Sequence, residues 1–290
     1  MKSNTTSPPR ETKDDHRKKA FVLTHLMLGD HICMVGAVRY LATQYDSVTV
    51  VCKDVYKSNI EKIYKDDPSI DFYVVRNDHE IGVNWGLSKE KFEQITEGYD
   101  VFTCGHHWGN PYRNSEDLKM YSIYDTVSPY REYYDAPFDF YDHMGLDRSV
   151  FWDYFHIAEQ DEDLFIKYLQ NISYVFVHYS SSTTTKFDIE KVENLFKLNK
   201  LDTLFINPCE NVYNENDAFF DIAQKLINYP IAYYKTVIEK ASKIIVTDSC
   251  FFCMAISLKT DARQIYVNAR NHANYCLPNL TKLNDIIFWS

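Results

Sequence analysis

Residues 243–258 read KIIVTDSCFFCMAISL, an apolar run, a short polar turn and a second apolar stretch in direct succession. The run KIIV is rich in β-branched residues, which is typical of a buried strand. The stretch FFCMAISL predicts a helix, and Asp248 or Ser249 can cap its first turn. A buried strand that turns directly into a helix is the repeating unit of a parallel sheet covered by helices.

The same pattern continues in both directions along the chain. Around residues 243–258, it predicts strands at 174–180, 203–208 and 262–269 and helices at 189–198 and 218–228. Nearer the N-terminus, it predicts strands at 20–26, 47–53 and 70–75, helices at 31–45 and 55–65, and a helix then a strand within 89–105. Residues 112–147 lack clean periodicity, and we expect helices there that are broken by Pro129 and Pro137. The sequence therefore predicts two α/β sets in series.

The periodicity divides the chain into three parts. Residues 1–19 are polar and mixed in charge, which predicts a disordered leader. We expect an N-terminal Rossmann-like domain at 20–155 and a C-terminal one at 156–290, with the boundary where the regular pattern restarts. Two doubly wound parallel sheets in series are the expected architecture.

Composition excludes several classes of function. The net charge is −10, from 31 basic and 41 acidic residues, whereas a nucleic-acid binder usually carries a basic surplus. No apolar run approaches the ~20 residues that span a bilayer, and the N-terminus lacks the apolar core of a signal peptide. The seven cysteines are an odd, scattered set, which favours a reducing compartment over a disulfide framework. We therefore expect a cytoplasmic protein without nucleic-acid partners or a transmembrane segment.

Three strand-to-helix loops carry the residues best suited to chemistry, because ligands bind at the carboxyl ends of parallel strands. The first loop contains Gly29 and Asp30, where Asp30 either caps the following helix or acts as a catalytic carboxylate. The second is a run of hydroxyls that ends in Lys186, and it is either an anion cradle or an ordinary polar loop. The third is the turn at Asp248 and Ser249, which either caps its helix or presents the helix amides to a phosphate.

The order and spacing of these loops resemble the heptosyltransferase-like glycosyltransferases, a family of the GT-B fold. That family has a Gly-Asp motif at its first helix, matched by LMLGDHICMVGAVRYL (26–41), and a Ser/Thr-rich loop ending in Lys, matched by HYSSSTTTK (178–186). A glutamate after the next strand is matched by Glu210. The family's Asp-Ser-Gly-x-x-His element has its counterpart in KIIVTDSCFFCMAISL (243–258). The resemblance runs over residues 20 to 270 and implies two Rossmann-like domains that face a central cleft.

The resemblance also implies roles for individual residues. Asp30 is expected to be the general base that deprotonates the acceptor hydroxyl, with Gly29 beside it on the acceptor side. The diphosphate of the donor is expected to lie against Ser182, Thr183, Thr184 and Lys186. Glu210 is expected to bind nucleoside hydroxyls, and the amides around Ser249 and Cys250 to bind a phosphate in a turn that Asp248 orients. The implied activity is a metal-independent, inverting transfer from a nucleotide-diphosphate sugar to a glycan or lipid-linked acceptor, with no resident cofactor.

This chain departs from the family pattern at several positions. The family glycine after Asp-Ser is Cys250, the family histidine is Cys253, and the proline that closes the first motif is Gly36. The arginine that usually precedes Gly-Asp has no equivalent. These changes bear on which donor is used rather than on the scaffold.

Other features leave alternatives open. His106 and His107 follow a predicted strand and either line the acceptor side or are ordinary loop residues. Cys250 and Cys253 have C-x-x-C spacing, but no second pair with zinc-ligand spacing accompanies them, so we expect no metal site. Two further functions fit the same fold: a sugar-nucleotide epimerase, and a non-catalytic protein that binds a nucleotide or glycan.

Overall fold

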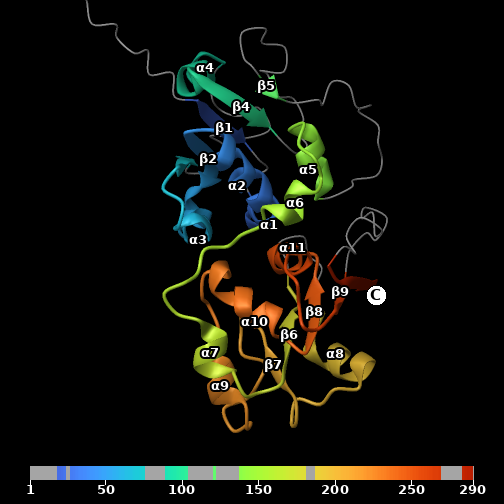
Figure 1. Ribbon diagram of the computed structural model, residues 1–290. Coiled ribbons are helices and arrows are strands. Elements are labelled where there is room, and N and C mark those ends of the chain that lie inside the picture. Colours follow the sequence, from blue (N-terminus) through green and yellow to red (C-terminus); the bar gives the residue numbers. More distant parts are fainter. Residues whose placement is uncertain are drawn as a thin grey trace, which may run out of the picture.

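The computed structural model describes residues 18–23, 27–75, 89–103, 120–121, 137–180, 187–268 and 283–289. Two five-stranded sheets dominate it, and in this part of the chain all neighbouring strands of both sheets run parallel (Figure 1). We call the elements from β1 to α6 the N-terminal half and those from α7 to β10 the C-terminal half. The prediction of two doubly wound parallel α/β units is therefore confirmed. No helix among the described residues is both long and apolar enough to cross a bilayer.

The sheet of the N-terminal half has the strand order β3-β2-β1-β4-β5. Its central strand β1 is almost wholly buried, as its apolar sequence KAFVL predicts, and it pairs with β2 on one side and β4 on the other. Lys19 already pairs with Ser47 and Tyr99, so the sheet begins one residue before Ala20. The strands are β1 (Lys19–Leu23), β2 (Ser47–Lys53), β3 (Ile70–Val75), β4 (Tyr99–Thr103) and β5 (Met120–Tyr121).

The single helix predicted at 31–45 is in fact two helices. The first begins at Leu28, so Gly29 and Asp30 lie inside its first turn rather than in a preceding loop. This first helix ends at Cys33, and the second helix begins at Val35, after Met34. The helices of this half are α1 (Leu28–Cys33), α2 (Val35–Gln44), α3 (Asp54–Tyr64), α4 (Lys89–Thr96), α5 (Phe138–His143) and α6 (Val150–Asp153).

The sheet of the C-terminal half has the order β10-β9-β8-β6-β7. The strand predicted at 262–269 is β9, and a further strand that was not predicted, β10, pairs with it in parallel. The segment DIIF has four residues, too few for an apolar pattern to identify it as a strand. Its pairing with β9 identifies it instead. The strands are β6 (Tyr174–His178), β7 (Leu204–Ile206), β8 (Lys243–Thr247), β9 (Gln264–Asn268) and β10 (Asp285–Phe288).

The helices of the C-terminal half are mostly short. Two begin at aspartates whose side chains accept hydrogen bonds from first-turn amides: Asp163 caps one and Asp188 the other. The helices are α7 (Leu164–Tyr168), α8 (Ile189–Phe196), α9 (Phe220–Gln224), the 3₁₀ helix η2 (Ile231–Tyr234), α10 (Lys235–Glu239) and α11 (Cys250–Ser257).

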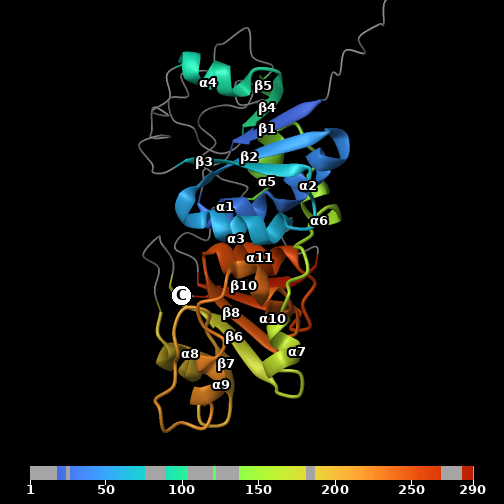
Figure 2. The same ribbon diagram turned by 90° about the vertical axis from the view of Figure 1, so that its left-hand side faces the viewer.

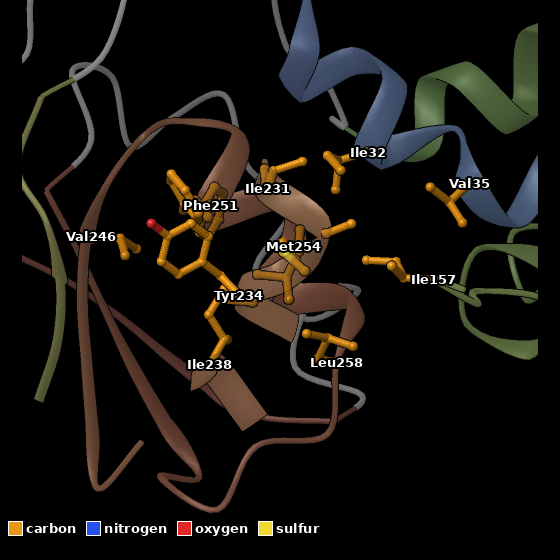
Figure 3. Packing of buried hydrophobic residues seen from close by; sticks show 14 of the residues in the cluster. Ile32, Val35, Ile157, Ile231, Tyr234, Ile238, Val246, Phe251, Met254 and Leu258 are labelled. Atoms are coloured by element: carbon orange, nitrogen blue, oxygen red, sulfur yellow. The ribbon is translucent and has the colours of Figure 1, made fainter. Parts of the chain in front are cut away.

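The two halves share one continuous apolar core. Ile32 of α1, Val35 of α2 and Ile157 belong to one cluster with Met254 of α11 and Leu258, the residue after that helix (Figure 3). Polar contacts join the halves as well: the Ile231 amide donates to Asn59 Oδ1 at 2.8 Å, and Trp152 Nε1 donates to the Ile256 carbonyl at 3.4 Å. Because apolar surface would be exposed if they separated, this contact stabilises their present arrangement.

Candidate functional site

The order of strands reverses at one place in each sheet. In the N-terminal half this switch lies between β1 and β4, and in the C-terminal half it lies between β6 and β8. The chain leaves β1 toward Gly29 and Asp30, and it leaves β8 toward Asp248 and Ser249. Open α/β sheets bind ligands at such switch points, beyond the carboxyl ends of the strands. Two of the predicted loops are therefore placed where the topology favours binding.

Helices α1 and α11, which follow β1 and β8 in the chain, pack against each other across the two halves (Figures 1 and 2). At Gly29, an added Cβ would lie 3.6 Å from the Cα of Cys250 and 3.6 Å from the Sγ of Cys253. The start of α1 therefore lies directly against the start of α11. The predicted general base and the predicted phosphate-binding turn come from opposite halves and meet at this junction.

Asp30 is the third residue of α1, and its Oδ2 accepts a hydrogen bond from the Met27 amide at 3.1 Å. The carboxylate thus caps its own helix, which was one of its two predicted roles. It is also largely withdrawn from solvent, and this desolvation raises its pKa from 3.8 to about 6, against the opposing effects of the Met27 hydrogen bond and the Lys53 charge. Among the described residues, no donor bonds to Oδ1. A carboxylate with this pKa and one oxygen available is suited to accept a proton near neutral pH.

His31 follows Asp30 in α1 and is buried, with 1% of its surface exposed. Its Nε2 has no hydrogen-bond partner in the described part of the chain. Burial, together with the positive charge of Lys53 at the end of β2, lowers the His31 pKa to about 3. The imidazole is therefore neutral at physiological pH.

The second set of polar groups lies where β6, β7 and β8 end. His178 is the last residue of β6, and its Nδ1 lies 3.0 Å from Ser249 Oγ. Its Nε2 lies 3.5 Å from the Sγ of Cys209, in the loop after β7. The ring also packs on Phe251, with 4.7 Å between ring centroids, and burial lowers its pKa to about 4. A neutral imidazole thus connects the loops after two strands.

Glu210 lies at the same edge of the sheet and is exposed. It accepts a hydrogen bond from the hydroxyl of Tyr179, which directly follows β6. The Phe187 amide donates to the Tyr179 carbonyl at 3.2 Å. Glu210 is therefore held next to the residues on either side of the predicted hydroxyl loop, a position in which a carboxylate can accept hydrogen bonds from a ligand.

Three thiols gather at the junction between the halves. A hydrogen bond with Cys33 of α1 raises the pKa of the Cys253 thiol, and burial raises it further, as do the nearby charges of Asp248 and Asp30. Burial raises the pKa of Cys250 to about 12. The thiols of Cys250 and Cys253 are therefore protonated at neutral pH and serve as small apolar groups at the contact. No group of three or more His, Cys, Asp or Glu among the described residues is arranged to hold a metal ion.

The comparisons with known proteins address the fold. A glycosyl transferase of family 9 from Veillonella parvula has a similar structure, with a TM-score of 0.54 and 12% sequence identity over 94% of this chain and 85% of that protein. The fold is GT-B. The E. coli heptosyltransferase WaaC with ADP matches with a TM-score of 0.45 and 12% identity, over 92% of this chain and 94% of that one. No protein-family model matches the sequence, and no match was found among curated proteins.

The GT-B fold brings together some of the predicted site residues. Gly29 and Asp30 meet Cys250 at the junction, and Asp248 is close enough for its charge to affect the Cys253 thiol. Ser249 and Glu210 lie at the carboxyl edge of the C-terminal sheet. Some predicted residues lie outside the described residues: His106, His107, Ser182, Thr183, Thr184 and Lys186.

Sequence reasoning gave no role to three residues near these groups, although His178 and Tyr179 open the predicted loop at 178–186. His178 and Lys53 are the last residues of β6 and β2, and Tyr179 directly follows β6. A polar residue at the carboxyl end of an apolar strand was the available signal, because that end of a parallel sheet faces the ligand. His178 and Tyr179 were counted both in the strand at 174–180 and in the loop at 178–186, and the hydroxyls and Lys186 of that loop received the predicted roles.

The two buried histidines predict an acid-sensitive fold. His31 and His178 remain neutral when folded but gain a proton near pH 6.5 when unfolded. The unfolded state therefore binds more protons below pH 6.5, and each histidine lowers the free energy of unfolding by about 1.4 kcal/mol per pH unit. Urea unfolding at pH 7.5, 6 and 5 measures this slope, which His31→Gln is expected to reduce. An unchanged slope in the variant would show that His31 titrates normally.

Proposed function

We propose that this chain is a glycosyltransferase that moves a sugar from a nucleotide-diphosphate donor to the hydroxyl of a glycan or lipid-linked acceptor. The observation that supports this proposal is the contact between α1 and α11, in which the helix turn that carries Asp30 packs against the start of α11, the predicted phosphate-binding turn. A fold similar to that of a family 9 glycosyl transferase supports it. Such a transfer needs a base on the acceptor side and an anion site on the donor side, and the two halves supply one each.

In the proposed reaction, Asp30 accepts the proton of the acceptor hydroxyl as the oxygen attacks the anomeric carbon. The bond from that carbon to the diphosphate oxygen breaks, and the nucleoside diphosphate leaves. Attack opposite the leaving group inverts the anomeric centre. A pKa of about 6 lets Asp30 be ionised at neutral pH and still be a useful proton acceptor.

On the donor side, the start of α11 would receive a phosphate. Its first-turn amides carry the partial positive charge of a helix N-terminus. The Ser249 side chain does not cap the helix, and Asp248 is anchored through its amide to the Asn268 carbonyl at 3.4 Å. Lys186 and the hydroxyls of Ser182, Thr183 and Thr184 would neutralise and hold the diphosphate, and these stay predictions. Fixed amides and a lysine would supply the charge stabilisation without a metal ion or a resident cofactor.

Glu210 is proposed to bind the ribose hydroxyls. The Tyr179 hydroxyl donates to one carboxylate oxygen, Oε1, which fixes the orientation of the group. Because that hydrogen bond restricts rotation of the carboxylate, the other oxygen also keeps its direction. A ribose diol presents two donors to such a carboxylate, so the contact would recognise the nucleoside without reading its base.

Thermal-shift measurements with UDP-, GDP-, ADP- and TDP-sugars test this proposal. We expect one nucleotide class to raise the melting temperature, and to raise it further as the ligand concentration increases, since a ligand that binds only the folded state stabilises it. Transfer is then measured with the sugar of that class and a panel of glycan acceptors. A chain that binds a donor but releases neither sugar nor nucleotide would be a non-catalytic binder. If none of the four classes shifts the melting temperature, the chain is not a nucleotide-sugar enzyme.

A further inference from the structure

The serine at the start of α11 does not behave as a helix cap. Ser249 has the extended backbone of an N-cap residue, with φ −156° and ψ 176°, yet its hydroxyl makes no hydrogen bond to the first-turn amides. A serine cap typically stabilises a helix by ~1 kcal/mol. The hydroxyl instead lies 3.0 Å from Nδ1 of His178, 71 residues earlier in the sequence. Another interaction therefore determines where this hydroxyl lies.

The neutral ring of His178 can form hydrogen bonds with Ser249 and Cys209 at the same time in only two arrangements. The neutral ring carries one proton, so one nitrogen donates and the other must accept. If Nδ1 holds the proton, it donates to Ser249 Oγ, and Nε2 accepts from the thiol of Cys209. If Nε2 holds it, Nε2 donates to Cys209 Sγ, and Ser249 donates to Nδ1. Both arrangements fit the distances of 3.0 Å to Ser249 and 3.5 Å to Cys209, and they point the Ser249 proton in opposite directions.

An anionic ligand distinguishes the two arrangements. A phosphate oxygen only accepts hydrogen bonds, so a serine beside it must donate its one proton outward. Ser249 can then only accept from His178, which places the ring proton on Nδ1. The ring is 5% exposed, and among the described residues its bare Nε2 would lack a donor without Cys209. Leaving a buried acceptor unpaired is costly, and the thiol supplies the missing donor.

We propose that Cys209, His178 and Ser249 form a hydrogen-bond relay that directs the Ser249 hydroxyl proton onto a phosphate of the nucleotide donor. In the relay the Cys209 thiol donates to Nε2, Nδ1–H donates to Ser249 Oγ, and Ser249 donates to the phosphate. No bond is made or broken. Ser249 contacts the ligand, while His178 and Cys209 are positioning residues. The relay rests on the proposed function, since it needs a diphosphate at the start of α11.

The location of the relay supports this role. His178 and Val246 are register partners on the neighbouring strands β6 and β8, and those strands form the switch point of the C-terminal sheet. Phe251 packs on the imidazole and fixes its plane. The ring therefore holds Ser249 at the point where the topology favours a ligand, and it ties this turn to the loop that carries Glu210.

Calorimetric titration with UDP, GDP, ADP and TDP tests the relay, using the nucleotide that binds wild-type protein most tightly. We expect Ser249→Ala to weaken binding about tenfold or more, because it removes a donor to a charged group. Cys209→Ala is expected to weaken it roughly twofold to tenfold, and Cys209→Ser, which keeps a donor, to restore most of that loss. Ser257→Ala is the matched control, since Ser257 lies at the other end of α11 and bonds only to the Cys253 carbonyl among described residues.

A second measurement reports on the proton itself. The ¹⁵N chemical shifts of the assigned His178 ring distinguish a protonated Nδ1 from a protonated Nε2. In the nucleotide complex we expect the proton on Nδ1. A proton on Nε2 in that complex, or equal binding by wild type and Cys209→Ala, would overturn the relay and leave the proposed function standing. If the wild-type chain binds none of the four nucleotides, the proposed function fails first and the relay is withdrawn with it.

Discussion

Asp30→Asn is expected to lower the rate of sugar transfer by at least about a hundredfold, the lower end of what a positioned general base contributes. The amide has no basic oxygen that can take the acceptor proton. Its Oδ1 can still accept from the Met27 amide, so α1 keeps its cap. Nucleoside diphosphate affinity is expected to stay nearly unchanged, because the proposed contact of Asp30 is with the acceptor. Initial rates and calorimetry on the same preparation separate the two effects.

The same substitution is expected to stabilise the fold at neutral pH. The pKa of Asp30 is 3.8 when unfolded and about 6 when folded, so the folded state binds more protons between these values. Stability from this group is therefore present at low pH and is lost as the pH rises toward 6. Removing the charge should recover roughly 1–3 kcal/mol at pH 7.5, and little at pH 4. Urea unfolding at the two pH values measures the difference.

Asp54→Asn serves as the control for loss of a charge. Asp54 is exposed in the first turn of α3, next to Lys53, and removing its charge should leave the transfer rate close to that of wild type. If Asp30→Asn loses activity and its free energy of unfolding does not rise, Asp30 acts as a structural cap of α1. Activity within a few-fold of wild type would mean that another group is the base.

Gly36→Ala is expected to destabilise the protein by about 1–3 kcal/mol, the usual cost of overpacking. In helix α2, alanine would normally stabilise by roughly 0.5–1 kcal/mol over glycine. Here an added Cβ would lie 2.4 Å from the Val150 carbonyl oxygen and 2.9 Å from that of Phe151. Because these atoms belong to the backbone of α6, they cannot rotate away as a side chain would. The steric cost therefore outweighs the helix propensity.

Gly29→Ala is the matched comparison for stability. Gly29 is also helical, and its added Cβ would meet its neighbours at 3.6 Å and 3.7 Å, which is ordinary van der Waals contact. Its free energy of unfolding in urea should be equal to or slightly above that of wild type. If Gly36→Ala is as stable as Gly29→Ala, helix α6 can move aside, and the close approach of α2 and α6 has no energetic importance.

The local pattern of the sequence was sufficient to predict most of the strands. The run KIIV becomes β8, and the segments SVTVVCK and IDFYVV become β2 and β3. Their apolar, β-branched residues are neighbours in the chain, so a window of a few residues contains the whole signal. The same reasoning predicted Asp30 and Ser249 as residues at helix starts beyond the strands.

Contacts between residues that are far apart in the sequence determined the other features of the fold and of the candidate site. The sequence by itself determined the α/β units, their order and the polar turns, because these depend on propensity and period over adjacent residues. Only the tertiary structure placed Gly29 against Cys250, withdrew Asp30 from water and joined His178 to Ser249 and Cys209. The physical reason is that burial and hydrogen-bond partners depend on how separate elements pack, and packing shifts a pKa that the residue type alone leaves at its ordinary value.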